Sequence, residues 1–399
     1  MNYISLFSAG GVGCFGFKQA GFDGVATSEL IERRLNVQKA NNKLKYAEGY
    51  ILGDITQEDV KKQLFESIDL FKKKENISDI DVIIFTPPCQ GMSVANHKKN
   101  DGTIDKNSLV VEALELVKQI KPKFFVAENV RAFMNTKCID HNQEKKIKEA
   151  FVDWLSEDYL YEDEIINFKD YGANSSRTRT LVIGVRKDLK NMVHPLDLFP
   201  SKEKETNLRD VIGHLPKLEK MGDIYSEDIY HNFKAYREDM RCWISDIKEG
   251  ESAFDNEDIT KRPHRIIDGE IVPNVKKNSS KYTRQYWDKV GPCVHTRNDI
   301  MASQNTVHPE DDRVFSIREL MLMMNIPNDF KWVESDEEYL NNLTFEEKEK
   351  FLKDNEINIR QCIGEAIPTI IIQKIANNIK DVLINGKKTK KTSGQLRFM

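Results

Sequence analysis

The stretch Asp81-Val82-Ile83-Ile84-Phe85-Thr86-Pro87-Pro88-Cys89-Gln90 decides the fold of this chain. Its first half is a run of β-branched and aromatic residues, which predicts a buried strand. The two prolines end the strand, because neither can donate a backbone hydrogen bond to a neighbour. Cys89 therefore stands in a stiff turn at a strand's carboxyl end, where open α/β sheets bind ligands. Most isolated cysteines are buried and inert, so the neighbouring motifs decide its role.

Strands and helices alternate on both sides of this stretch. Apolar runs predict further strands at 3–7, 24–29, 50–54, 124–130, 164–168 and 180–185. Amphipathic or charged segments predict helices at 31–41, 59–74, 108–120 and 143–155. This alternation over residues 1–186 predicts an α/β domain with a doubly wound parallel sheet.

The composition bounds the class of protein. The chain has 399 residues, which is long for a single core, so we expect more than one lobe. Of these residues 39% are hydrophobic and 31% charged, which is typical of a soluble globular protein. No apolar run is long enough for a membrane span, and the N-terminus enters a strand without a signal sequence, so we expect a cytoplasmic protein with no membrane partner. The six cysteines stand singly without metal-ligand spacing, which predicts reduced thiols and no metal.

The pattern changes after Arg186. Residues 187–300 have short, irregular apolar segments with many aromatic and charged residues, which indicates a second lobe. Although the net charge is −4, residues 259–299 hold nine lysines and arginines against four acidic residues. This segregation favours a nucleic-acid interface. We expect DNA contacts from Arg262, Arg265, Lys276, Lys277, Arg284 and Arg297.

The C-terminal part is expected to return to the first domain. We assign residues 301–385 to a hinge and a C-terminal helix, with an amphipathic helix at 368–383 that packs on the sheet. The acidic helical stretch 334–357 is expected to be a surface insertion, and the basic tail 386–399 to be disordered.

A glycine-rich turn follows the first strand. Gly11-Val12-Gly13-Cys14-Phe15-Gly16 has the spacing of a dinucleotide-binding turn, and Glu29 ends the next strand. Any adenosine ligand could use such a turn and such an acid, and a tight structural turn is the plain alternative. A second acid, Asp54, also ends a strand. Two acids suit a cationic adenosine cofactor, so we favour S-adenosylmethionine (AdoMet).

Three further groups converge at the same sheet edge. They are the Cys89 thiol, the Glu128 carboxyl and the guanidinium groups of Arg177 and Arg179. A thiolate adds to an electron-poor ring carbon, a carboxyl can protonate a ring nitrogen, and an arginine can hold a carbonyl oxygen. Together they can make a pyrimidine nucleophilic at C5. Alternatively, Glu128 is a surface strand end and the two arginines are salt-bridged.

With these motifs in order, the chain resembles the C5-cytosine DNA methyltransferases over nearly its whole length. The resemblance rests on Pro87-Pro88-Cys89-Gln90, Glu128-Asn129-Val130, Asp170-Tyr171-Gly172, Arg177-Thr178-Arg179, Arg313 to Pro327 and Ile363 to Pro368. It implies a Rossmann-like AdoMet-dependent sheet with a smaller, irregular target-recognition domain at 187–300. It also implies a sequence-specific enzyme of the bacterial restriction–modification type, acting on double-stranded DNA. We further expect a monomer and a cognate restriction endonuclease.

The resemblance also assigns roles. It implies that Cys89 attacks C6 of a flipped cytosine, Glu128 protonates N3, and Arg179 holds O2 with help from Arg177. The cofactor residues that it implies are Phe7, Gly11, Gly13, Glu29, Leu30, Asp54, Ile55, Pro87, Leu109 and Ala366. The DNA-contacting residues near the nucleophile are Gln90, Ser93, Lys98 and Lys99.

Three departures from the family pattern concern residues around the site. Ala9 and Val12 replace two glycines of the first turn, Asn174-Ser175 replace a Pro-Gln pair, and Glu365 replaces an asparagine. None alters Cys89, Glu128 or Arg179, so we expect an active enzyme. The alternatives are a tRNA methyltransferase of the same fold, whose Cys-Phe-Thr signature is absent here, an NAD-dependent oxidoreductase, and a catalytically idle DNA-binding module.

Overall fold

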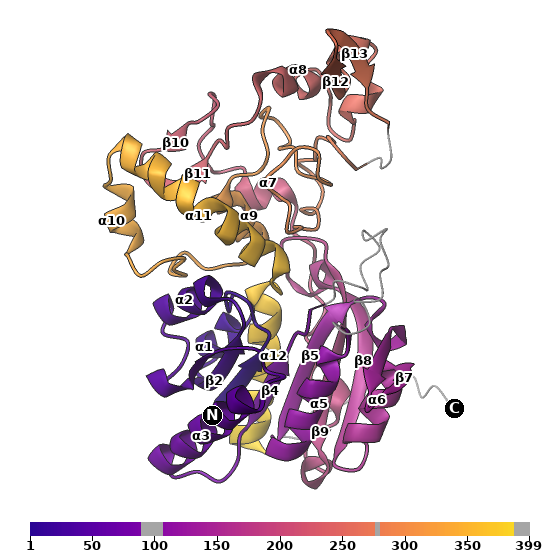
Figure 1. Cartoon of the computed structure of the whole chain (residues 1–399), viewed down its shortest axis with the longest axis vertical. Coiled ribbons are helices and arrows are strands. Elements are labelled where there is room, and N and C mark those ends of the chain that lie inside the picture. The colour runs from indigo at the N-terminus through magenta and orange to yellow at the C-terminus, as the bar shows by residue number, and fades with distance from the viewer. Residues whose placement is uncertain (89–106, 276–279, 387–399) are drawn as a thin grey trace.

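A seven-stranded sheet forms the core of the larger lobe (Figure 1). The computed structural model describes residues 1–88, 107–275 and 280–386. In spatial order the strands are β3 (Tyr50–Leu52), β2 (Asp23–Glu29), β1 (Asn2–Leu6), β4 (Val82–Phe85), β5 (Phe124–Val130), β9 (Thr178–Arg186) and β8 (Tyr159–Asn167). The predicted α/β class is therefore confirmed, and β4, the strand of the opening stretch, lies at the centre.

The sequence predicted a parallel sheet, but one strand of the sheet runs the other way. β9 runs antiparallel to both of its neighbours, β5 and β8. The reason is the connection at 168–177, which turns at Gly172 (φ 95°) and holds no crossover helix of the kind that parallel neighbours require. As a consequence, β9 begins at the same edge at which β4 and β5 end.

Helices cover both faces of the sheet. On one face lie α3 (Glu58–Glu75), α5 (Leu109–Ile120) and α6 (Ile147–Leu155). On the other lie α1 (Phe15–Gln19) and α12 (Thr369–Asn385), as predicted for the C-terminal helix. α1 and α12 approach so closely at Gly16 that a Cβ there would lie 2.5 Å from the backbone nitrogen of Gln373. α2 (Glu32–Ala40) follows β2.

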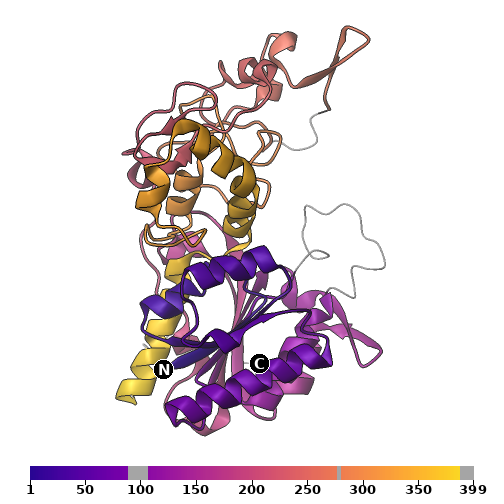
Figure 2. The ribbon, with the colours of Figure 1, turned by 60° about the vertical axis from the view of Figure 1, so that its left-hand side comes forward.

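The second lobe stands above the carboxyl edge of the sheet (Figures 1 and 2). Its core joins α7 (Leu208–Ile212), β11 (Asp228–Asn232), α9 (Ile317–Met323), α10 (Glu337–Asn341) and α11 (Phe345–Glu365). β10 (Ile224–Tyr225) pairs with β11, while α8 (Arg241–Ile244) and the ribbon of β12 (His264–Ile267) and β13 (Glu270–Pro273) form the far end.

The stretch 334–357 packs on the second lobe through one of its faces. There α11 buries Leu352 and Glu356. α9 to α11 pack with α7 and β11, and Val12 and Val37 of the first lobe join the same cluster. We propose that the second lobe extends to Glu365.

The predicted helix 143–155 is also shorter than expected. β6 (Lys137–Asp140) and β7 (Gln143–Lys146) form a hairpin, and α6 begins only at Ile147. The basic tail at 387–399 lies outside the described residues. In the part of the chain that the structure describes, no helix is long and apolar enough to cross a membrane.

Candidate active site

The turn after β4 is fixed by β1 and β5. The Thr86 hydroxyl donates to the carbonyl oxygen of Phe7 (2.8 Å), and the Asn129 side-chain amide donates to the carbonyl oxygen of Pro87 (2.9 Å). Asn129 is buried. The asparagine of the Glu-Asn-Val motif therefore braces the Pro-Pro turn. Cys89 itself lies just outside the described residues.

Glu128 and Arg179 meet because of the antiparallel register. Val130 pairs with Arg179 and Glu128 pairs with Leu181, so Glu128 and Arg179 are diagonal neighbours on one face of the sheet. Arg179 Nε lies 3.2 Å from Glu128 Oε1. Were β9 parallel, its first residues would lie at the opposite edge. Glu128 and Arg179 therefore lie together at this edge, through a strand direction that the sequence did not reveal.

Glu128 is a buried carboxyl group. Burial raises its pKa, and the charges of Arg179 and Arg177 oppose that rise. Its Oε1 lies 3.2 Å from Arg179 Nε, so the carboxyl and the guanidinium form a pair. Both residues line the cavity, where a ligand can reach them.

Arg177 has a structural task that the sequence did not suggest. It is buried, and its Nη1 donates to the carbonyl oxygens of Val294 (3.1 Å) and Gly364 (3.2 Å). These bonds join the residue just before β9 to two segments of the second lobe. The guanidinium of Arg177 is therefore committed to backbone oxygens, whereas Arg179 points to Glu128.

A cavity of about 790 Å³ extends from the glycine turn to Glu128 and Arg179. Most of the cofactor residues implied by the resemblance line it, namely Phe7, Gly13, Glu29, Leu30, Asp54, Ile55, Pro87, Leu109 and Ala366. Gly11 does not line it; with φ 78° it faces the Gln38 side chain and shapes the turn from behind. The size suits an adenosine cofactor next to a base.

The acids of this cavity fit a ribose and an amine. Glu29 is buried, and its Oε1 accepts one hydrogen bond from the backbone of Ile31 (3.1 Å). Asp54 is held by Thr56, whose backbone and hydroxyl both donate to Asp54 Oδ1. A carboxylate therefore stands at the end of β2 and another just after β3. The hydroxyl and amino groups of a cationic adenosine cofactor could donate hydrogen bonds to them. No groups of metal-ligating side chains occur among the described residues.

Several lining residues were not predicted from the sequence. Thr296, Gln361 and Cys362 belong to this group, and so does His295. Burial lowers the pKa of His295, and the charges of Arg177 and Arg179 lower it further. Neutral imidazole is therefore the form that faces the cavity. These residues come from segments remote in sequence, and no local motif marks them.

The predicted DNA-contacting residues are scattered. Arg265 on β12 and Arg297 are exposed, and Arg297 lines the cavity. Arg262 is half-buried and donates from Nε to the carbonyl oxygen of Asn256 (2.6 Å). The remaining candidates Gln90, Ser93, Lys98, Lys99, Lys276 and Lys277 lie outside the described residues.

Arg284, which was expected to contact DNA, is buried in the second lobe. It is 4% exposed, and its guanidinium donates to the carbonyl oxygens of Ile244, Ile247, His308 and Asp311 and to the Asp312 carboxylate. A side chain so committed cannot reach DNA while the lobe stays folded. Arg284 therefore stabilises the second lobe.

The departures from the family pattern have local partners. The Asn174 side chain donates to the carbonyl oxygen of Leu322 (2.9 Å), and the buried Ser175 hydroxyl contacts Met324 Sδ (3.6 Å). Both therefore join the first lobe to the end of α9. Glu365 forms an ion pair with Arg34 of α2 (2.6 Å), which joins the lobes at the rim of the cavity.

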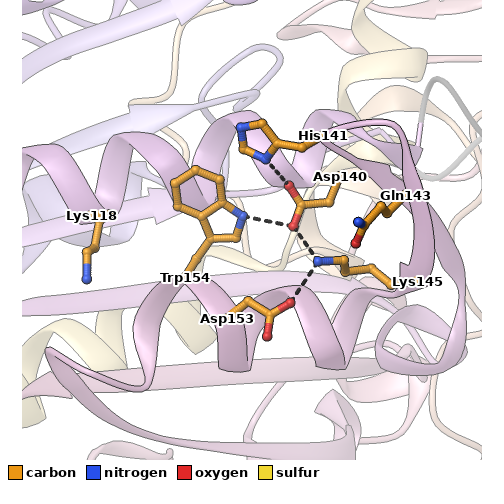
Figure 3. Close-up of a pocket in the computed structure, with 7 residues that line it drawn as sticks. All are labelled: Lys118, Asp140, His141, Gln143, Lys145, Asp153 and Trp154. Carbon is orange, nitrogen blue, oxygen red and sulfur yellow. Dashed lines mark hydrogen bonds and ion pairs between the residues drawn. The ribbon is translucent and has the colours of Figure 1, made fainter.

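A second depression of about 440 Å³ lies beside the β6–β7 hairpin (Figure 3). There Asp140 accepts hydrogen bonds from His141 (2.8 Å), Lys145 (2.9 Å) and Trp154 (3.2 Å), and Lys145 also pairs with Asp153 (2.7 Å). Because these polar groups satisfy one another, the cluster supports the hairpin and shows no features of a ligand site.

Comparisons with known proteins agree with this geometry. The family model described as C-5 cytosine-specific DNA methylase matches residues 1–381. The chain is 28% identical over 394 residues to the Type II methyltransferase M1.HgaI of Avibacterium volantium, covering 94% of this chain and 97% of that protein. It is also 28% identical over 380 residues to the Type II methyltransferase M1.HphI of Haemophilus parahaemolyticus, covering 95% and 86%.

Solved structures share the fold. An E. coli protein encoded within a prophage, described as a candidate DNA modification methyltransferase, has a TM-score of 0.64 at 20% identity, covering 96% of this chain and 99% of its own. The Entamoeba histolytica methyltransferase EhMeth has a TM-score of 0.54 at 14% identity, covering 96% and 98%. At these identities the likeness shows the fold alone.

Proposed function

Because this chain belongs to the C-5 cytosine-specific DNA methylase family, we propose that it methylates C5 of one cytosine within a specific DNA sequence through a covalent bond to Cys89. It is a C5-cytosine DNA methyltransferase of the restriction–modification type. The observation that supports the finer proposal best is the buried Glu128 carboxyl, paired with Arg179 at the inner end of the cavity. The oxidoreductase alternative gives neither residue a role.

Cys89, Glu128 and Arg179 each have a separate role in the proposed reaction. The Cys89 thiolate forms a bond to C6, and the pair of electrons displaced from the C5–C6 double bond makes C5 nucleophilic. Glu128 donates a hydrogen bond or its proton to N3, while Arg179 donates to O2. Both stabilise the negative charge that the attack places on the ring. Later loss of the C5 proton to a base restores the double bond and releases the thiolate.

The cofactor site is proposed for AdoMet, which supplies the methyl group when bound. Glu29 is placed to accept hydrogen bonds from ribose hydroxyls, and Asp54 from the adenine amine. Phe7 and Leu30 line the cavity and can pack on the adenine ring. The carboxylates of Glu29 and Asp54 also suit the positive charge of a sulfonium.

The target base has to leave the helix before it can reach Glu128. We propose that the enzyme flips the cytosine out of the duplex, at a cost of a few kcal/mol. The second lobe faces the same edge of the sheet, and its exposed Arg265 and Arg297 are candidates for contacts with DNA. We further propose that the enzyme acts as a monomer and protects host DNA from a cognate restriction endonuclease.

Mass spectrometry of DNA from cells that express the chain tests this function. Wild-type cells should accumulate 5-methylcytosine, and cells that express a Glu128→Gln variant at equal level should accumulate far less. Absence of 5-methylcytosine in DNA together with its appearance in tRNA would contradict the proposal and favour the RNA-modifying alternative.

A further inference from the structure

A buried lysine lies beneath the glycine turn that lines the cavity. Lys43 follows α2 and is only 6% exposed. Its ammonium group donates to Ser8 Oγ (2.8 Å), Gln38 Oε1 (2.7 Å) and Thr27 Oγ1 (3.3 Å). All three acceptors are neutral oxygens, and burial lowers the pKa of Lys43. A charge in such a place is tolerated only when its hydrogen bonds are satisfied.

Lys43 belongs to a connected network of side-chain hydrogen bonds. The Ser8 and Ser5 hydroxyls lie 3.3 Å apart, those of Ser5 and Thr27 3.1 Å apart, and the Thr27 hydroxyl donates to Gln38 Oε1 (2.9 Å). An ammonium group has three hydrogens, one for each of the three oxygens that Lys43 contacts.

The same network holds the turn on its strained side. Phe7 (φ 59°) and Ala9 (φ 46°) both adopt the left-handed backbone conformation, which residues other than glycine rarely adopt. Gln38 donates to the carbonyl oxygen of Ala9 (2.6 Å), while Lys43 holds the hydroxyl of Ser8 between them. Phe7, Ser8 and Ala9 all line the cavity. The network thus fixes the part of the turn that a cofactor would contact.

We propose that Lys43 is a positioning residue that, together with Gln38, holds the turn at Phe7–Gly13 in the shape that receives the cofactor. The proposal rests on the proposed AdoMet site. It also accounts for Ala9, because the bond from Gln38 offsets the strain at a position where the family pattern has glycine. Lys43 lies under the turn and does not line the cavity, so its effect passes through Ser8 and Gln38.

The test compares Lys43→Met with Lys45→Met in the full-length chain. Lys45 is partly exposed and pairs with Asp23 and Glu75, so its loss removes the same charge without touching the turn. Titration calorimetry with AdoMet should show an affinity about tenfold weaker for Lys43→Met and unchanged for Lys45→Met. At saturating AdoMet, kcat and DNA affinity of Lys43→Met should stay within about twofold of the wild type.

A milder variant guards against loss of the fold. Ser8→Ala removes one of the three oxygens that Lys43 contacts, together with the contact between the Ser8 and Ser5 hydroxyls, and should weaken AdoMet binding by less than Lys43→Met. Wild-type affinity in folded Lys43→Met and Ser8→Ala would overturn the proposal. A parallel fall of AdoMet and DNA affinity would also overturn it, since it would mean that Lys43 supports the whole domain. If the wild type itself does not bind AdoMet, the proposed function fails instead.

Discussion

Among single residues, Glu128 matters most to the proposed chemistry. Its carboxyl group is buried beside Arg179, in a cavity that also holds the proposed cofactor side chains. Burial raises its pKa, although the two arginines oppose the rise, so the protonated form persists to higher pH than for an exposed glutamate. That is the form that can donate to a ring nitrogen.

Replacement of Glu128 by glutamine should separate chemistry from binding. Glutamine keeps the shape and can donate a hydrogen bond, but it cannot transfer a proton, so kcat should fall by about 10²–10³-fold. AdoMet affinity should not change. Because the acid form is required, wild-type kcat should fall as pH rises through the pKa of Glu128, and the variant should lack this decline. Single-turnover rates between pH 5 and 9 measure it; an unchanged profile would contradict the role.

Glu29 can be tested independently of catalysis. Glu29→Ala should weaken AdoMet binding by about tenfold, because the ribose hydroxyls would lose a charged acceptor. DNA affinity should stay the same. Glu32→Ala, at the exposed start of α2, is the matched control for loss of an acidic side chain nearby. An unchanged AdoMet dissociation constant in Glu29→Ala would rule out the ribose contact.

At the element scale, β9 is the strand that completes the site. Its antiparallel direction brings Arg179 to the edge where β5 ends, and Arg177, just before its first residue, meets the backbone of the second lobe. The sequence indicated the strand and the arginines, but direction depends on how the short connection at 168–177 closes in space. Local patterns do not contain that information.

Other elements show the same limit. β1, β2, β4 and β5 were predictable because apolar β-branched runs have few alternative structures. The β6–β7 hairpin was missed because Gln143–Lys146 is polar and precedes a true helix. The sequence showed that the second lobe is rich in basic residues, but it did not show which of them are exposed. Arg284 is buried, and it donates to backbone oxygens that no sequence motif marks.

The contact of α1 with α12 predicts a strong effect at Gly16. A methyl group there would meet the backbone of Gln373 and Thr369 at 2.5 and 2.6 Å, and backbone atoms cannot move aside cheaply. Gly16→Ala should lower the free energy of unfolding by about 1–3 kcal/mol. Gln19→Ala, on the exposed side of the same short helix, should change it little. Urea denaturation compares them; equal stability would mean that the helices are farther apart.

At the scale of the whole molecule, the two lobes are joined by polar contacts around the cavity, among them those of Arg177 and the Arg34–Glu365 pair. The second lobe itself depends on buried charge. Arg313 lies between Asp311 and Glu319, and His308 sits beside them. Arg313 holds the pKa of the Glu319 carboxyl far below its usual range in spite of burial.

This buried cluster predicts that the protein loses stability in mild acid. His308 Nδ1 accepts from the backbone of Asp311 (2.9 Å), and burial lowers the pKa of His308 from 6.5 to about 3. Between pH 7 and pH 5 the imidazole of His308 therefore takes up a proton in the unfolded chain but not in the folded protein. This difference should lower the free energy of unfolding by about 2 kcal/mol over that range. The carboxylate of Glu319 adds a further loss only below its unfolded pKa.

Denaturation at pH 7 and pH 5 measures the drop, with His308→Gln as the comparison. The variant lacks the titrating ring and should depend less on pH than the wild type. Identical pH dependence in both proteins would show that His308 is not the group responsible.

Covalent trapping reports whether Cys89 forms a bond to the target cytosine. A duplex with 5-fluorocytosine in a library of sequence contexts is incubated with the enzyme and AdoMet, and denaturing electrophoresis reports protein that stays attached, because fluorine cannot leave as the C5 proton does. We expect an adduct on a defined subset of sequences, mapped by peptide mass to Cys89, and none with Cys89→Ser. An adduct with Cys89→Ser, or none with a wild-type enzyme that methylates ordinary DNA, would contradict this expectation.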